Sequence, residues 1–317
     1  MIMRLSIVTT LYNSSPFIEE FHRRATAAAE SITSDFEVVM VNDGSPDDSL
    51  EQAIALHKSD DRVVLVDLSR NFGHHRAMMT GLGYARGELV FLIDSDLEED
   101  PELLRPFLAT MEGERCDVVY GVQAKRRGDI FETLSGMIFY WIMSRLGGIK
   151  IPKNVTTVRL MTRRYVRSLI RHREREMIIS GLWVITGFHQ VPQKIDKKPS
   201  NRRSNYSVLA KFRVAIDLVT AFSDSLLYGV FCAGLAISVV ALFVMIYFVA
   251  QYLITGHILA GWTSVMASIW MFGGLTILLI GLIGIYVARI FNETKHRPYT
   301  IVREVYRAGS SNQRKPP

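Results

Sequence analysis

Apolar and polar positions alternate in blocks over the first part of the chain. Short apolar, β-branched runs, each about as long as a buried strand, occur at Leu5–Thr10, Phe36–Val41, Arg62–Leu68, Leu89–Ile93 and Asp117–Tyr120. Segments with helical patterns lie between them, at Pro16–Ser31, Ser49–His57, His74–Ala85 and Pro101–Glu112. This alternation predicts an α/β fold with a mostly parallel sheet that is covered by helices on both faces.

A different pattern, continuous apolar sequence, fills much of the C-terminal third. Residues 225–288 contain no Asp, Glu, Lys or Arg. Ser225–Tyr252 and Trp262–Ala288 each exceed the roughly 20 residues that a helix needs to cross a bilayer. Buried helices of a soluble protein rarely stay uncharged over such a length. We therefore predict a hairpin of two transmembrane helices.

Lys and Arg residues crowd on both sides of this apolar stretch and are absent from the link between its halves. By the positive-inside rule, this distribution predicts an integral protein of the inner (cytoplasmic) membrane with both termini in the cytoplasm. Met1–Tyr12 is too short for a signal peptide and is typical of a strand. Cys116 and Cys232 fit a reducing compartment.

The formal net charge of +6 is compatible with nucleic-acid binding or with a membrane. The membrane explains it better, because the basic residues lie next to the apolar spans, where anionic headgroups attract them. No zinc, helix-turn-helix or RNA-binding signature is present, so we expect no nucleic-acid partner. Ile130–Leu146 and Val208–Phe222 are apolar enough on one side to be interfacial amphipathic helices, and a core helix is an equal alternative for the first.

Polar residues follow each of the first four predicted strands. Ligands bind beyond the carboxyl ends of parallel strands, which share one edge of the sheet. Each polar segment alone can be explained as a turn or a helix cap, but their common position predicts a binding site. The segments are TTLYN (Thr9–Asn13), NDGSPDD (Asn42–Asp48), SRNFGHHRA (Ser69–Ala77) and DSDLEED (Asp94–Asp100).

The common glycine-rich phosphate loops are missing from this edge. Gly81, Gly83 and Gly87 lack the spacing of a dinucleotide fingerprint, and no GxxxxGK[ST] sequence occurs. A metal ion held by carboxylates is the alternative, and Asp94 and Asp96 can both approach one hard divalent cation at the end of a strand. Such a cation would neutralise a departing diphosphate. Three neighbouring carboxylates are better explained as solvated residues around the start of the next helix: Glu99, Asp100 and Glu102.

Together these motifs resemble those of family 2 glycosyltransferases with the GT-A fold. The similarity is to the branch that transfers a sugar from a nucleotide to a polyprenyl phosphate, such as dolichyl-phosphate mannose synthase and the bactoprenol glucosyltransferases. The family's opening strand resembles SIVTTLYN, and its acidic nucleotide loop resembles VNDGSPDD. Its RNFGKxxAxxxGL segment is similar to SRNFGHHRAMMTGL, and its DxDLQxxP metal motif is similar to DSDLEEDP. The resemblance covers nearly the whole chain. It implies a cytoplasmic GT-A catalytic domain at residues 1–206 and a juxtamembrane amphipathic helix at 207–224. Two transmembrane helices would follow at 225–291, and a cytoplasmic tail at 292–317.

The resemblance also implies roles for individual residues. The metal, Mg or Mn, would be held by Asp94 and Asp96, with Glu98 as a third candidate ligand. Both aspartates would be catalytic, together with Arg126 and Arg127, which match a cationic segment that faces the phosphates. Contacts to the nucleotide sugar would come from Thr10, Tyr12, Asn13, Asp43, Arg70, Asn71 and His74. The acceptor phosphate would be bound by Arg202, Arg203, Ser204 and Tyr206 in RRSNYS.

The chain departs from the family pattern at several positions. Glu98 replaces a glutamine, His74 replaces a lysine, and Arg202 replaces a glycine. The acidic residue that usually precedes RLM is replaced by residues 156–158. These changes leave the proposed metal pair intact, but they weaken the inference from the family about which sugar is transferred.

The implied reaction is an inverting, metal-dependent transfer of a sugar to polyprenyl (undecaprenyl) phosphate, with UDP-glucose as the expected donor. A lipid phosphate is already an anion, so it needs no general base to act as a nucleophile. The alternatives are another membrane family 2 glycosyltransferase acting on a polysaccharide or glycolipid, and an inactive nucleotide-binding scaffold. A processive synthase would normally carry QxxRW, which is absent, and Asp43, Asp94 and Asp96 argue against inactivity. Whether the protein forms a homo-oligomer stays open.

Overall fold

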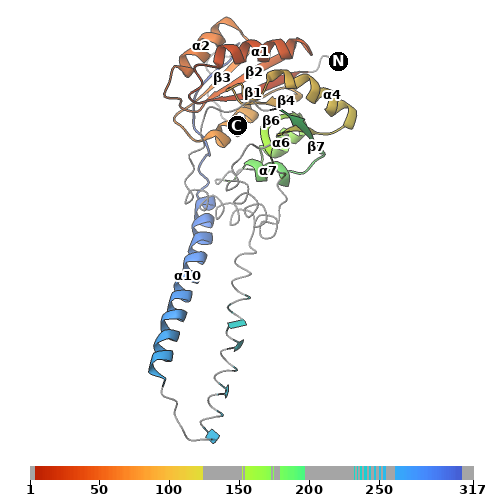
Figure 1. The fold of residues 1–317 in the computed structure, drawn as a ribbon. Coiled ribbons are helices and arrows are strands. Elements are labelled where there is room, and N and C mark those ends of the chain that lie inside the picture. Colours follow the sequence, from red (N-terminus) through yellow and green to blue (C-terminus); the bar gives the residue numbers. More distant parts are fainter. Residues whose placement is uncertain are drawn as a thin grey trace. The chain divides into compact units, whose positions relative to one another are not determined.

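The computed structural model describes residues 4–123, 152, 154–172, 174, 179–196 and 261–308, with scattered positions between 232 and 254. The chain divides into two compact units. The first comprises Met1–Ser135, Lys150–Asn205 and Arg297–Pro317, and the second comprises Gly136–Ile149 and Tyr206–His296. The sheet belongs to the first unit, and a long apolar helix, α10, belongs to the second (Figure 1).

An eight-stranded mixed sheet forms the centre of the first unit, in the order β7-β5-β6-β4-β1-β2-β3-β8. The neighbours β4, β1, β2 and β3 are all parallel. β6 lies antiparallel between β4 and β5, β7 pairs parallel with β5, and β8 pairs antiparallel with β3. The strands are β1 (Leu5–Leu11), β2 (Phe36–Asn42), β3 (Val63–Leu68), β4 (Leu89–Leu92), β5 (Val118–Gln123), β6 (Val155–Thr162), β7 (Gln190–Ile195) and β8 (Val302–Tyr306).

Helices cover both faces of the sheet, as the sequence predicts. The core on one face joins side chains of α1, α2 and α4, including Phe21 and Phe107. The core on the opposite face joins side chains of α3, α6 and α7, including Met78 and Tyr165. Every residue of β1 to β4 is buried, which explains why these strands are mainly apolar instead of alternating. The helices are α1 (Ile18–Glu30), α2 (Ser49–Ser59), α3 (His74–Tyr84), α4 (Leu104–Glu114) after a 3-10 turn η1 (Pro101–Leu103), α6 (Arg163–Leu169) and α7 (Ile179–Ile185).

The mostly parallel α/β architecture is therefore confirmed, and the sequence also located β1 to β5 and α1 to α4. The sheet differs from the expectation in one respect. β5 does not continue the parallel series, because β6, which comes later in the chain, lies between β4 and β5. β8 extends the opposite edge with residues that were expected to belong to a C-terminal tail.

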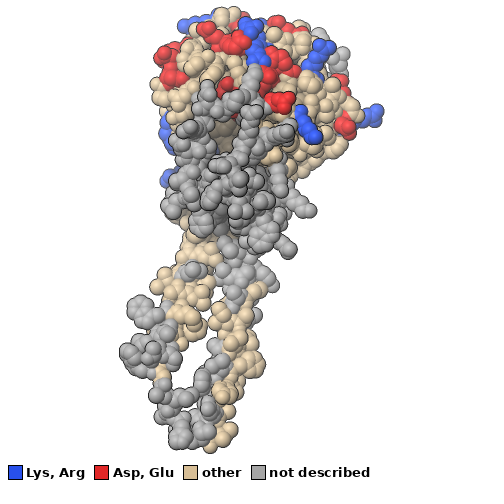
Figure 2. All heavy atoms as spheres, in the orientation of Figure 1, with Lys and Arg blue, Asp and Glu red and all other residues tan. Residues whose placement is uncertain are grey.

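The second unit contains α10 (Trp262–Thr294). Its window Met271–Ala288 has a mean hydropathy of 2.2 and none of it is buried. Within the described part of the chain, α10 is the one helix with the length and composition to cross a membrane. Red and blue side chains gather over the first unit in Figure 2, whereas the apolar segment is tan where it is described.

Several expectations fall on residues that the structure does not describe. The first predicted span, Ser225–Tyr252, is described only at scattered positions, and Ile130–Leu146 and Val208–Phe222 lie outside the described residues. The two-helix transmembrane hairpin and the positions of the termini therefore stay predictions. The same holds for the domain limits 1–206, 207–224, 225–291 and 292–317.

Candidate functional site

The loops that follow β1, β2, β3 and β4 meet at one edge of the sheet, as the sequence predicts. The backbone N–H of Asp43, after β2, donates to the carbonyl of Leu11 in β1 at 3.0 Å. The hydroxyl of Ser95, after β4, donates to the carbonyl of Thr10 at 2.9 Å. These contacts bring the candidate residues of the separate loops into one neighbourhood.

Asp43 joins the loop after β2 to the loop after β3. It is 2% exposed, and its Oδ1 and Oδ2 accept the backbone N–H groups of Phe72 at 2.7 Å and Gly73 at 3.0 Å. Burial raises the pKa of Asp43, although these N–H groups and the charges of His74 and Arg70 oppose the shift. The carboxylate thus fixes the backbone of the RNFG segment at the edge of the site.

Gly44 brings the same two loops into close contact. Its φ is +59°, in the region that glycine adopts without strain. A Cβ atom at this position would lie 2.5 Å from the backbone carbon of Arg70 and 2.5 Å from the backbone nitrogen of Asn71. The glycine of the acidic loop is therefore required by packing against the RNFG segment.

His74 connects β1 to the predicted metal pair. Its Nδ1 lies 3.0 Å from the Thr10 hydroxyl, and its Nε2 lies 3.3 Å from Oδ1 of Asp94. Burial opposes a charged imidazole, but the hydrogen bond and charge of Asp94, with the charges of Asp43 and Asp96, raise the pKa of His74 overall. His74 thus lies beside Asp94 at the position where the resemblance implies a lysine.

Asp94 and Asp96 are both partly exposed, whereas Ser95 between them is only 4% exposed. The Ser95 hydroxyl contacts the carbonyl of Thr10 and, at 3.1 Å, the hydroxyl of Ser14. Oδ1 of Asp96 accepts the backbone N–H of Glu98 at 3.1 Å. Ser95 therefore anchors the loop in the core while the carboxylates on either side reach the surface.

The donor atoms at this edge fit a hard divalent cation. Two partly exposed carboxylates can supply oxygen ligands, and Mg or Mn takes its remaining ligands from phosphate oxygens and water. Among the described residues, no three His, Cys, Asp or Glu side chains are grouped as a metal site. Asp94 and Asp96 as metal ligands, with Glu98 as a third candidate, therefore stay a prediction.

Four of the residues predicted to contact the nucleotide have exposed side chains, namely Tyr12, Asn13, Arg70 and Asn71. Tyr12 is 42% exposed, and Asn13, with a φ of +52°, donates its backbone N–H to the Ser45 hydroxyl at 2.8 Å. Arg70 and Asn71 are exposed in the loop after β3. The Arg70 guanidinium lies 4.2 Å from the centre of the Phe72 ring. Their roles in binding stay predictions.

The acidic run after β4 contains one buried carboxylate that was expected to be solvated. Glu99 is 1% exposed, and its Oε2 accepts the backbone N–H of Val158 in β6 at 3.1 Å. The expectation that Glu99 is solvated was therefore wrong, because this carboxylate is part of the joint between the loop and β6. Asp100 and Glu102 lie at the start of η1, as expected, and both accept Nη2 of Arg24, at 2.6 and 2.5 Å.

A buried arginine on β6 was not identified from the sequence. Arg159 is 1% exposed and its guanidinium carbon lies 3.0 Å from the centre of a Trp183 ring in α7. It donates to the backbone carbonyls of Thr156 and Thr157, both at 3.2 Å. Burial lowers the pKa of Arg159 to about 9. This side chain packs between β6 and α7.

The remaining predicted site residues lie outside the described residues. These are the phosphate-facing Arg126 and Arg127 and the acceptor residues Arg202, Arg203, Ser204 and Tyr206. Their roles stay predictions.

Residues 6–170 match the family described as Glycosyl transferase family 2. The chain belongs to this family. A Mycobacterium tuberculosis protein described as "Putative glycosyltransferases" is 50% identical over 304 residues, which cover 96% of this chain and 89% of the relative. This family 2 glycosyltransferase is also 29% identical over 310 residues to an undecaprenyl-phosphate 4-deoxy-4-formamido-L-arabinose transferase of Yersinia pestis, covering 96% and 94% of the two chains.

A solved structure with a similar fold is glucosyl-3-phosphoglycerate synthase from Mycobacterium tuberculosis in complex with Mn²⁺, UDP and glucosyl-3-phosphoglycerate. The sequence identity is 17%, the TM-score is 0.49, and the match covers 70% of this chain and 80% of that chain. The family match and the relatives show that this chain is a glycosyltransferase.

Proposed function

We propose that this glycosyltransferase transfers a sugar from a nucleotide sugar to polyprenyl phosphate at the cytoplasmic face of the inner membrane. One observation carries the proposal. A carboxylate pair, Asp94 and Asp96, lies on the same sheet edge as Asp43, in a chain whose helix α10 is long and apolar enough to cross a bilayer. UDP-glucose is the proposed donor and undecaprenyl phosphate the proposed acceptor.

The donor would lie across the loops after β1, β2 and β3. Tyr12 and Asn13 would contact the base and ribose, and Asp43 would hold the neighbouring loop in place through the N–H groups of Phe72 and Gly73. Asp94 and Asp96 would hold Mg or Mn, which when bound stabilises negative charge on the departing nucleoside diphosphate. His74 would keep Asp94 oriented through the contact at 3.3 Å.

The acceptor is proposed to be a lipid phosphate for two reasons. A relative that aligns over 96% of this chain is named as an undecaprenyl-phosphate sugar transferase. The apolar helix α10 would bring the catalytic unit to the membrane, where such lipids are found. The phosphate needs no general base, so the enzyme would act mainly through positioning and charge stabilisation. Direct displacement by this anion would invert the anomeric carbon.

The test uses the full chain, purified in detergent, with undecaprenyl phosphate, MnCl2 or MgCl2, and a panel of UDP- and GDP-sugars. We expect the lipid to gain the mass of one sugar residue with one preferred donor. Transfer to a sugar or glycolipid acceptor without any lipid phosphate would instead favour another membrane glycosyltransferase activity. Binding of a nucleotide sugar without turnover of any would contradict the proposal and favour a nucleotide-binding scaffold.

A further inference from the structure

The last described strand, β8, follows α10 in sequence and is built into the first unit beside the site. It pairs antiparallel with β3. Just before β8, the carbonyl of Ile301 accepts the backbone N–H of Ser69 at 2.9 Å, and the hydroxyl of Thr300 lies 2.8 Å from that of Thr80 in α3. The chain thus returns from its apolar segment to the loop that begins the RNFG motif.

Arg303 in β8 bridges two acceptors at the end of β3. Its Nη1 lies 3.1 Å from Oδ2 of Asp67, and its Nη2 donates to the carbonyl of Ser69 at 2.9 Å. Asp67 is 2% exposed, and a carboxylate buried to this degree is destabilising unless hydrogen-bond donors surround it. Asn42 Nδ2 supplies another donor to this carboxylate, at 2.7 Å.

From Asp67, hydrogen bonds continue to the loops of the predicted nucleotide pocket. Oδ1 of Asn42 accepts the backbone N–H of Ser45 at 3.2 Å, and the Ser45 hydroxyl accepts the backbone N–H of Asn13 at 2.8 Å. A second branch starts at Ser69, which directly precedes Arg70. Arg303 is therefore linked to the loops after β1, β2 and β3.

We propose that Arg303 is a positioning residue for nucleotide binding, acting through Asp67 and the carbonyl of Ser69. This inference rests on the proposed function, since it assigns the loops after β1 to β3 to the nucleotide. Removal of the guanidinium leaves the buried Asp67 carboxylate with fewer donors and frees the start of the RNFG loop. Nucleotide affinity falls, whereas Asp94 and Asp96 follow β4, a strand that does not pair with β8.

The test measures binding of UDP, with GDP in parallel, to the full chain in detergent and MnCl2, together with the kinetics of transfer. For Arg303→Ala we expect about tenfold weaker nucleotide binding and a matching rise in KM for the donor, with kcat changed by less than about twofold. Arg303→Lys should restore part of the affinity, because a single ammonium group replaces the guanidinium that reaches both Asp67 and the carbonyl of Ser69. Glu304→Gln is the matched control on the same strand and should behave as wild type, since the Glu304 side chain contacts Tyr306 instead.

The outcomes separate the two proposals. If wild type binds UDP or GDP and Arg303→Ala binds it equally well, the positioning role is wrong and the proposed function stands. A lower melting temperature with unchanged KM would identify a structural brace only and would also overturn the inference. If Arg303→Ala does not fold, Arg303→Lys decides, and wild-type affinity in that variant counts against the role. A wild-type protein that binds no nucleotide overturns both proposals.

Discussion

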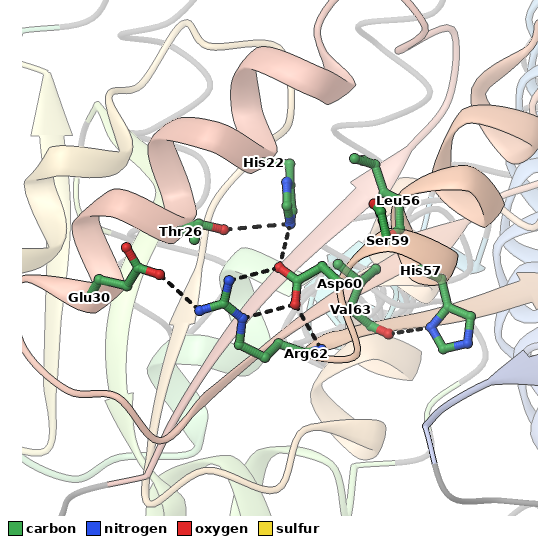
Figure 3. Close-up of polar contacts among 9 residues, drawn as sticks. All are labelled: His22, Thr26, Glu30, Leu56, His57, Ser59, Asp60, Arg62 and Val63. Carbon is green, nitrogen blue, oxygen red and sulfur yellow. Dashed lines mark hydrogen bonds and ion pairs between the residues drawn. The ribbon is translucent and has the colours of Figure 1, made fainter.

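Carboxylates lie at both edges of the parallel part of the sheet, and their hydrogen-bond partners differ between the amino ends and the carboxyl ends of the strands. At the amino end, Asp60 accepts Nε and Nη2 of Arg62, at 2.8 and 3.0 Å, and contacts Nε2 of His22 at 3.2 Å (Figure 3). Arg62 also reaches Glu30 at 2.9 Å. Burial opposes the charge of Asp60, but the hydrogen bonds from Arg62 lower its pKa.

At the carboxyl end, the pKa of Asp43 is raised by burial in spite of its backbone donors. Asp94 lies beside an imidazole whose own pKa is raised, and Asp96 is partly exposed. The comparison shows how carboxylates on one sheet divide between tasks. Asp60 is bonded to an arginine, whereas Asp43 is bonded to backbone N–H groups and Asp94 lies beside an imidazole.

The largest effect should follow from changing the carboxylates at the carboxyl end. Asp94→Asn and Asp96→Asn should each lower kcat by about a hundredfold or more, because stabilisation of the leaving diphosphate is lost. Binding of Mn²⁺, measured by calorimetry on the full chain, should weaken in parallel. Asp100→Asn is the matched control in the same acidic run. Wild-type turnover in both variants would remove the metal assignment.

A change at the amino end should affect stability instead of turnover. Asp60→Asn should lower the free energy of unfolding by about 1–3 kcal/mol, since hydrogen bonds to a charged group are lost. Its kcat/KM should stay within about twofold of wild type. Thermal unfolding and steady-state kinetics check the two expectations. A large loss of activity in a folded Asp60→Asn protein would break the comparison.

The pH dependence of stability should run in opposite directions at the two ends. A carboxyl with a raised folded pKa, such as Asp43, contributes stability below its ordinary value of 3.8 and loses it as the pH rises through the folded pKa. Asp60, with a lowered pKa, contributes stability above 3.8 and loses it as the pH falls.

Melting temperatures of wild type, Asp43→Asn and Asp60→Asn over a pH series that spans 3.8 measure these contributions. The advantage of wild type over Asp60→Asn should grow as the pH rises, and its advantage over Asp43→Asn should shrink. Equal slopes for the two variants would contradict the contrast between the two ends.

The smallest effect is expected for the acidic residues that lie outside the site. Asp100→Asn and Glu102→Gln each remove one carboxylate from Arg24, and both carboxylates are more than one-third exposed. The free energy of unfolding should change by less than about 1 kcal/mol, with transfer unaffected. Loss of transfer in either variant would show that Asp100 or Glu102 belongs to the site after all.

The sequence predicted the parallel core because its strands are buried on both faces and separated by helices. Polar residues at consecutive strand ends were enough to place Thr10, Asp43, His74 and Asp94 at one edge. The position of β6 could not be predicted in the same way, because an antiparallel strand that joins between β4 and β5 leaves no local signal.

Two residues whose surroundings the sequence did not reveal, Glu99 and Asp67, have partners far away in the chain. The sequence alone does not distinguish a buried carboxylate from an exposed one within an acidic run. Glu99 is buried because its carboxylate accepts a backbone N–H of β6. Asp67 lies within an apolar strand, and Arg303, more than 200 positions later, is its counterion. Such pairs depend on which strand occupies the edge of the sheet, and that is a property of the folded chain.

The position of β8 also affects how the protein is made. Strand β8 follows α10 in sequence, so the ribosome completes the apolar helix before β8 exists. Until then, the edge of β3 lacks the partner that it has in the folded protein, and unpaired edges are sites of aberrant pairing during synthesis. Completion of the sheet, and with it the ion pair of Asp67, therefore comes after the apolar helix has left the ribosome.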